Sequence, residues 1–117
     1  MGRLTTHVLD LASGKPAVGM TVELAAIEGS VRRPVTRATT NKDGRCDDAL
    51  LEGGRFTSGV WQLEFHVAAY YASQGVALPR PPFLDVVTVR FGVASAEQNC
   101  HVPLLVTPWS YSTYRGS

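Results

Sequence analysis

The sequence predicts a single all-β domain that spans residues 1–117, and three observations support this prediction. First, a chain of this length is the size of one domain. Second, turn-forming residues cluster at 14–16, 41–44 and 53–54. Third, the segments between these turns alternate apolar and polar residues, which is typical of strands with one buried face. About seven or eight such segments favour a sandwich or a barrel.

The first half of the chain contains four predicted strands. They cover residues 5–11, residues 20–28, residues 31–40 and a short piece around Arg55 and Phe56. Pro34 lies inside the third segment, and a proline cannot donate the main-chain hydrogen bond that a central strand needs. We therefore expect the third strand to lie at the edge of a sheet.

The clearest alternation follows at residues 61–67. Apolar side chains at the odd positions alternate with the polar Gln62, Glu64 and His66, so we expect one buried face and one polar face. Residues 68–74 are rich in alanine and break the alternation, and Gly75 suits the position just past the end of a helix. This segment predicts one short helix.

Three more strands are predicted in the last third of the chain. They cover residues 83–93, residues 99–107 and residues 109–115, and a tight connection through Pro108 joins the last two. In the middle segment the apolar residues at 102, 104 and 106 should enter the core, so His101 and Leu105 should point outward. In the first strand Val8 takes the core position, which turns His7 outward.

The same alternation places Ser112 and Tyr114 on one face of the last strand. If the first strand and the last two strands share a sheet, this face also carries His7, His101 and Leu105. Large apolar groups beside titratable ones suggest that another subunit covers the face.

Composition argues against several classes of protein. The net charge is +1 and there is no basic run, so strong nonspecific binding to nucleic acid or anionic membranes is not expected. No apolar stretch approaches the ~18 residues of a membrane helix, and no signal peptide is recognisable. We expect a soluble cytoplasmic protein, with the peroxisome as the alternative. Cys46 and Cys100 are expected to be reduced thiols rather than a disulfide.

Two histidines on one face could share proton transfers, because histidine titrates nearest to neutral pH. Arg45 follows a predicted turn, and its planar guanidinium suits an anionic or carbonyl-rich ring.

Other kinds of catalytic chemistry have no supporting motif in the sequence. Catalytic zinc needs three protein ligands, and His7 and His101 supply two. No motif supports a thiol nucleophile at Cys46 or Cys100.

Four segments, in order along the whole chain, resemble one known family. They are residues 4–10 (LTTHVLD), residues 40–45 (TNKDGR), residues 101–105 (HVPLL) and residues 114–117 (YRGS). The chain resembles the transthyretin-related 5-hydroxyisourate hydrolases. The closing tetrapeptide together with His7 separates these enzymes from the transthyretins that carry hormones.

The resemblance implies a fold, an assembly and a reaction. The fold is a transthyretin-like (prealbumin-like) sandwich of two sheets and eight antiparallel strands with one short helix. The assembly is a homotetramer, a dimer of dimers, with sites in a channel between the dimers. The reaction is hydrolysis of 5-hydroxyisourate at its N1–C6 amide, which yields 2-oxo-4-hydroxy-4-carboxy-5-ureidoimidazoline during urate degradation. No cofactor or metal is implied.

The resemblance also assigns roles to residues. The catalytic set is His7, Arg45, His101 and Ser117, and the substrate-binding set is His7, Arg45, Tyr114 and Arg115. One histidine would take a proton from water, and the other histidine or the Ser117 hydroxyl would help to protonate the leaving nitrogen. Arg45 would stabilise the oxyanion and Tyr114 would orient the ring. Which histidine is the base stays open.

Two other functions are weighed against this one. The first is a carrier of small aromatic ligands of the transthyretin type, which would use the same channel without chemistry. His7, Arg45 and the tetrapeptide at residues 114–117 speak against it. The second is a structural or adhesive sandwich module, which normally sits behind a signal peptide or within a longer chain.

Overall fold

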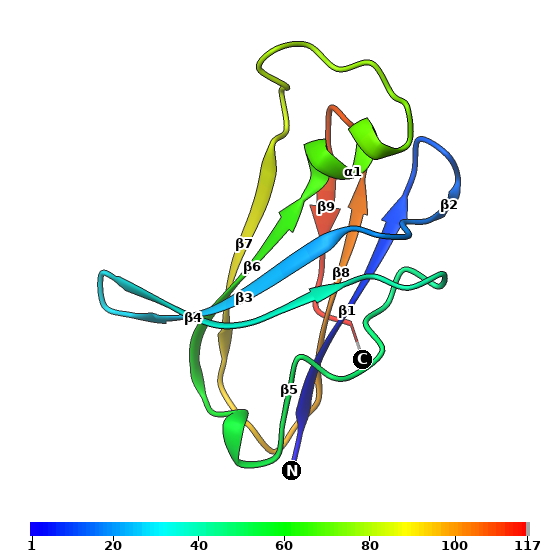
Figure 1. The fold of residues 1–117 in the computed structure, drawn as a ribbon. Helices are drawn as coiled ribbons and strands as arrows, with labels where there is room; N and C mark the ends of the chain where they lie inside the picture. The colour runs from blue at the N-terminus through cyan, green and yellow to red at the C-terminus, as the bar shows by residue number, and fades with distance from the viewer. Residues whose placement is uncertain (117) are drawn as a thin grey trace.

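The computed structural model describes residues 1–116, and these residues form two β-sheets packed face to face (Figure 1). The first sheet has the order β2-β1-β8-β9, and β5 pairs with β1 as well. Its strands are β1 (Arg3–Asp10), β2 (Lys15–Pro16), β5 (Leu51–Glu52), β8 (Cys100–Val106) and β9 (Tyr111–Thr113). The predicted neighbours, the first strand and the last two, therefore do share a sheet.

The second sheet has the order β4-β3-β6-β7. Its strands are β3 (Thr21–Glu28), β4 (Val31–Thr39), β6 (Gly59–His66) and β7 (Val86–Val93). The strand with Pro34 is β4, and it lies at the edge of the sheet as predicted. The helix α1 (Val67–Ser73) follows β6, one residue earlier than expected, and Gly75 beyond it has the positive φ of 82° that ends many helices.

The core lies between the two sheets and follows the predicted alternation. Leu63 and Phe65 of β6 are fully buried, and so are Val8 of β1 and Leu104 of β8. Every second residue of β1 is buried from Leu4 onward. The all-β sandwich with one short helix is thus confirmed over the described residues.

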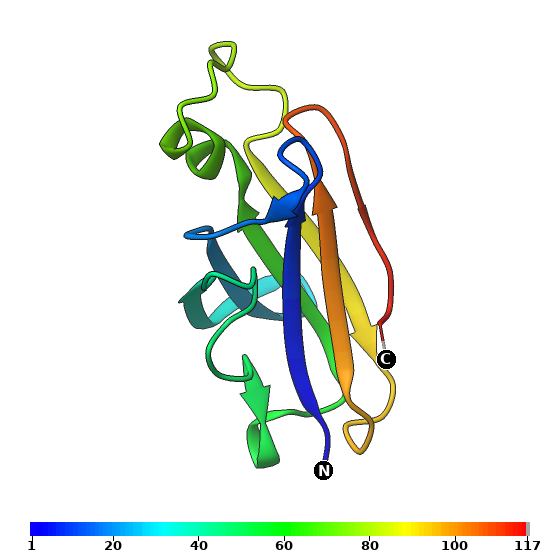
Figure 2. The same ribbon diagram turned by 90° about the vertical axis from the view of Figure 1, so that its right-hand side faces the viewer.

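One pair of strands differs from the antiparallel arrangement that the resemblance implies. β1 and β8 run parallel, in a register that extends from Leu4 opposite Cys100 to Asp10 opposite Val106. Figure 2 shows these two strands side by side and pointing the same way. Most of the chain separates them, so no hairpin sets their direction, and a parallel pair needs such a long connection.

Several boundaries in the loops differ from the prediction. A short strand was expected around Arg55 and Phe56. The strand, β5, lies earlier, at Leu51–Glu52, and Arg55 instead ends a single 3-10 turn at Gly53–Arg55. The predicted turn at Lys15 contains β2, whose two residues pair with Leu9 and Asp10. β7 begins only at Val86, after a bend in which the Asp85 carbonyl accepts hydrogen bonds from the first two residues of α1. β9 begins at Tyr111, after a hydrogen-bonded turn between Thr107 and Ser110.

A buried carboxylate fastens the helix to the end of β1. Asp10 is 3 % exposed, and its oxygens accept hydrogen bonds from the hydroxyls of Tyr70 (2.8 Å) and Tyr71 (2.7 Å). The main-chain nitrogens of Ala12 and Ser13 also donate to Asp10. Burial raises the pKa of this carboxyl, but these hydrogen bonds outweigh burial and hold the pKa below its usual range.

The outer face of the second sheet carries the polar residues predicted for β6. Arg32 binds Glu64 through two hydrogen bonds of 2.7 and 2.8 Å, and His66 contacts Glu23 at 2.7 Å. His66 therefore lies on the sheet opposite to the other two histidines. Within residues 1–116, no helix is long and apolar enough to cross a membrane, and Cys46 and Cys100 are both free.

Candidate active site

His7 and His101 lie together on the outer face of the first sheet. Their ring centroids are 6.4 Å apart and the ring planes are inclined by 34°. Each side chain is half-buried, while Val8 and Val102 beside them are buried in the core. The alternation argument is therefore confirmed for both histidines, because β1 and β8 are adjacent and in register.

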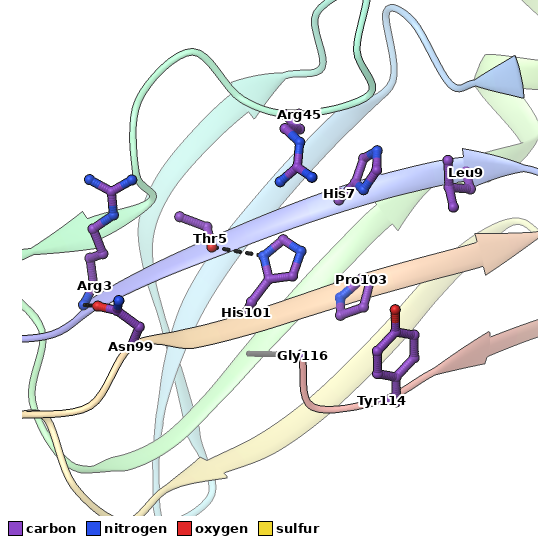
Figure 3. Close-up of a pocket in the computed structure, with 10 residues that line it drawn as sticks. All are labelled: Arg3, Thr5, His7, Leu9, Arg45, Asn99, His101, Pro103, Tyr114 and Gly116. Atoms are coloured by element: carbon purple, nitrogen blue, oxygen red, sulfur yellow. Dashed lines mark hydrogen bonds between the residues drawn. The ribbon is translucent and has the colours of Figure 1, made fainter.

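The two rings open onto a cavity of about 460 Å³. This volume lies within the range of small-molecule sites. The cavity is lined by Arg3, Thr5, His7, Leu9, Arg45, Asn99, His101, Pro103, Tyr114 and Gly116 (Figure 3). Its walls come from β1, β8, the loop before β5 and the segment after β9.

The turn at Asn41–Gly44 brings Arg45 to the histidines. The Asn41 side-chain oxygen accepts hydrogen bonds from the main-chain nitrogens of Asp43 (2.9 Å) and Arg45 (3.2 Å). Gly44 has a φ of +74°, and its carbonyl accepts a 2.8 Å hydrogen bond from the main-chain nitrogen of Val8. Arg45 thereby forms a β-bridge with His7. Figure 3 shows its guanidinium directed toward Thr5 and His101.

Burial and charge lower the pKa of both histidines. For His7 the largest cause is burial, followed by the Arg45 guanidinium, and a main-chain hydrogen bond to Asp43 opposes them. For His101 burial again comes first, followed by Arg45 and His7. Because both pKa values lie below the ordinary 6.5, both rings are neutral at neutral pH and each can accept a proton.

Two hydrogen bonds hold His101 in place, one at its ring and one at its main chain. Its Nδ1 lies 2.8 Å from the hydroxyl oxygen of Thr5. On the other side, the main-chain nitrogen of Gly116 donates a 2.8 Å hydrogen bond to the His101 carbonyl. A Cβ at Gly116 would lie 2.8 Å from Cδ2 of the ring, which is closer than real Cβ contacts. Glycine is therefore the residue that lets the tail pack against this histidine.

Comparison with known proteins agrees with the sequence motifs. The model of the HIUase/Transthyretin family matches residues 4–116. The chain belongs to the HIUase/transthyretin family.

The proteins that this chain resembles include 5-hydroxyisourate hydrolases and transthyretins. The chain is 56 % identical to a 5-hydroxyisourate hydrolase of Ralstonia nicotianae, and the match covers all of both chains. It is 30 % identical to the solved 5-hydroxyisourate hydrolase of Klebsiella pneumoniae, with a TM-score of 0.82 and complete coverage of both chains. It is 25 % identical to sea bream transthyretin in complex with thyroxine, with a TM-score of 0.87, covering 97 % of this chain and 94 % of that one.

The structure brings some of the residues singled out from the sequence to the cavity and places others elsewhere. Tyr114 lines the cavity with the two histidines and Arg45. Ser112 lies opposite Leu105 on the same face of the sheet but does not line the cavity. The Arg115 side chain turns away and contacts Gln98 and the Asn99 carbonyl, each at 3.4 Å. Ser117 lies outside the described residues.

Some residues of the cavity were not named as candidates from the sequence, among them Arg3, Thr5 and Asn99. Arg3 and Thr5 have the same parity as His7 in β1, so the alternation that placed His7 could also have found them. Asn99 accepts a 3.2 Å hydrogen bond from the Arg3 main chain, and no signal in the sequence marks it. Among the residues of the described range, no three His, Cys, Asp or Glu side chains gather as metal ligands.

The turn that carries Arg45 generates a prediction about Gly44. A Cβ there would collide with the Val8 carbonyl, and a positive φ costs other residues roughly 1–2 kcal/mol. We expect Gly44→Ala to lower the free energy of unfolding by about 3 kcal/mol or more in urea denaturation.

Gly14→Ala is the matched control for this prediction. Gly14 has the same φ of 74°, but nothing lies within 4 Å of the position where its Cβ would stand. Gly14→Ala should therefore lower the free energy of unfolding only by the cost of the positive φ. Equal destabilisation by both substitutions would show that contact with β1 does not hold the Arg45 turn.

Proposed function

We propose that this chain hydrolyses 5-hydroxyisourate to 2-oxo-4-hydroxy-4-carboxy-5-ureidoimidazoline, a step of urate degradation. The observation that carries the proposal is the meeting of two neutral imidazoles with the Arg45 guanidinium in a small-molecule cavity. The Ralstonia nicotianae hydrolase, 56 % identical over the whole chain, supports the choice of substrate.

The first step is the attack of water on the C6 carbonyl carbon of the ring. One imidazole accepts a proton from water while the new C–O bond forms, and the carbonyl electron pair moves to oxygen. The rings of His7 and His101 suit this step because each is neutral and faces the cavity. A positioned proton acceptor contributes roughly 10²–10⁴-fold to such a rate.

Arg45 stabilises the oxyanion that forms in this step. Its guanidinium lies close enough to lower the pKa of both histidines, so its field reaches the space between the rings. A charge that is already in place when the oxyanion forms requires no reorganisation, and loss of one such donor costs roughly 10²–10³-fold.

The second step breaks the bond between C6 and N1. The oxyanion reforms the carbonyl, and N1 leaves with the bonding electron pair and takes up a proton. The protonated imidazole, or the Ser117 hydroxyl, supplies this proton, and the new acid group ionises to a carboxylate. We propose that Tyr114 helps to bind the ring from within the cavity, and that Arg115 contributes indirectly, by fastening the tail to Gln98 and Asn99.

The alternative function is a non-catalytic carrier of small aromatic ligands. The similarity to sea bream transthyretin, solved in complex with thyroxine, favours this function. A carrier, however, gains nothing from two neutral imidazoles beside a guanidinium. Turnover of freshly generated 5-hydroxyisourate followed by absorbance separates the two functions.

We propose further that the chain forms a homotetramer, a dimer of dimers. Phe83 and Trp109 are 69 % and 59 % exposed, and their ring centroids lie 6.2 Å apart. Two large exposed aromatic side chains side by side are typical of an interface. β7 and β9 are also edge strands in the described part of the chain, and edges invite pairing.

Replacement of Trp109 tests this assembly. We expect Trp109→Glu to lower the mass measured by sedimentation equilibrium from that of a tetramer, because it places a charge within an apolar contact. Val31→Glu, at an equally exposed position on β4, should leave the mass unchanged. A wild-type chain that sediments as a monomer would refute the tetramer.

The two histidines give a kinetic prediction. His7→Asn and His101→Asn should each lower kcat about 10²-fold or more, because each removes a proton acceptor or donor. The fold should persist, which circular dichroism checks. His66→Asn is the control, since His66 lies on the other sheet beside Glu23. Unchanged turnover in both site variants would remove these residues from the mechanism.

The lowered pKa values predict how activity depends on pH. A histidine with a lowered pKa becomes protonated only at a pH below the ordinary histidine pKa of 6.5. Its neutral form, which acts as the base, therefore persists into mild acid. We expect kcat/KM to fall on the acid side with an apparent pKa below 6.5. An apparent pKa above 6.5 on the acid side of the profile would contradict the assignment of His7 and His101 as neutral bases.

A further inference from the structure

Thr5 makes a contact with a site residue that the proposed mechanism has not used. Thr5 on β1 stands opposite His101 on β8 in the parallel register. Both side chains point to the outer face, where the Thr5 hydroxyl lies 2.8 Å from Nδ1 of His101. Both residues line the cavity, and Figure 3 shows this contact along one of its walls.

The direction of this hydrogen bond decides where the ring carries its proton. A threonine hydroxyl can donate or accept, so the contact alone leaves both tautomers open. The proposed hydrolysis needs an unprotonated nitrogen on the part of the ring that faces the cavity. The nitrogen beside Thr5 must then carry the proton and donate it to the hydroxyl oxygen.

The opposite edge of the ring fixes which nitrogen faces the cavity. Nδ1 and Cδ2 are both bonded to Cγ and lie on opposite edges of an imidazole. Nδ1 lies against Thr5, and Cδ2 lies against Gly116, where a Cβ would come within 2.8 Å. With both edges held, the end of the ring that carries Nε2 points away from the sheet.

We propose that Thr5 is a positioning residue that keeps the His101 proton on Nδ1, so that Nε2 offers its lone pair to water. This inference rests on the proposed hydrolysis. When Nε2 takes the proton, the bond from Nδ1 to Thr5 becomes charge-assisted and strengthens. A contact that strengthens during the reaction raises kcat more than it changes KM.

Other charged and titratable groups face His101 from every neighbouring segment. They are Arg3 and His7 on β1, Arg45 after the turn and Tyr114 after β9. Substitutions of Thr5 leave all of them in place. A change confined to Thr5 variants therefore reports on the hydroxyl rather than on the field of the site.

The test combines Thr5→Val, which removes the hydroxyl at constant shape, with Thr5→Ser, which retains it. Nitrogen-15 NMR of labelled histidine, recorded well above the histidine pKa, tells a protonated ring nitrogen from an unprotonated one. The spectrum of His101→Asn assigns the His101 signals. The same proteins are assayed for kcat and KM with 5-hydroxyisourate.

We expect the wild type and Thr5→Ser to carry the His101 proton on Nδ1. Thr5→Val should spread the proton over both nitrogens and lower kcat about 10-fold, with little change in KM. Thr113→Val is the matched control. It removes a strand hydroxyl that donates a 2.7 Å hydrogen bond to the Pro103 carbonyl on β8. That variant should keep both the His101 signals and kcat.

Three results would overturn the inference. They are a wild-type proton on Nε2, an unchanged tautomer and kcat in Thr5→Val, or an equal loss of kcat in Thr113→Val. The wild-type spectrum tests the tautomer even if Thr5→Val does not fold. Absence of turnover in the wild type would refute the hydrolysis, while the spectra would still decide the tautomer.

Discussion

The parallel pairing of β1 with β8 is the constraint on which the site depends. It sets Thr5 opposite His101 and His7 opposite Pro103, so two histidines from distant parts of the chain share one face. A slip of one residue would turn an entire row of side chains to the other face and send the valine at 102 outward. Burial of that row in the core holds the register, and the same burial keeps both imidazoles half-exposed.

Arg45 acts on the site in two opposing ways. Its charge lowers the pKa of both histidines, which weakens them as proton acceptors. In the proposed hydrolysis the same charge would favour the oxyanion that forms when a histidine takes a proton from water. A base of lowered pKa is also a stronger acid once it has been protonated, which suits the return of the proton to a leaving nitrogen. In the proposed mechanism the Arg45 guanidinium would therefore assist both the attack of water and the departure of the leaving nitrogen.

Features that follow from the alternation of apolar and polar residues could be predicted from the sequence. Features that depend on which strands pair with each other could not. The outward directions of His7 and His101 followed from the apolar rows beside them, and the edge position of β4 followed from Pro34. The parallel direction of β1 and β8 is set by packing between distant segments, which one sequence does not display. β2 was missed because its two residues look like part of a turn. Alternation alone puts Thr5 on the face of His7, but the contact of Thr5 with His101 depends on the pairing of β1 with β8.

The distance along the chain between β1 and β8 also governs how the fold is reached. The side-chain contacts between them join residues 96 positions apart. Closing so long a loop costs entropy before any pairing compensates for it, so domains rich in such contacts fold slowly. During synthesis β1 emerges long before its main partner, with the hydrogen-bonding groups of that edge exposed. The first strand of this chain therefore stays without its main partner during most of synthesis, and an unpaired strand edge is prone to aggregation.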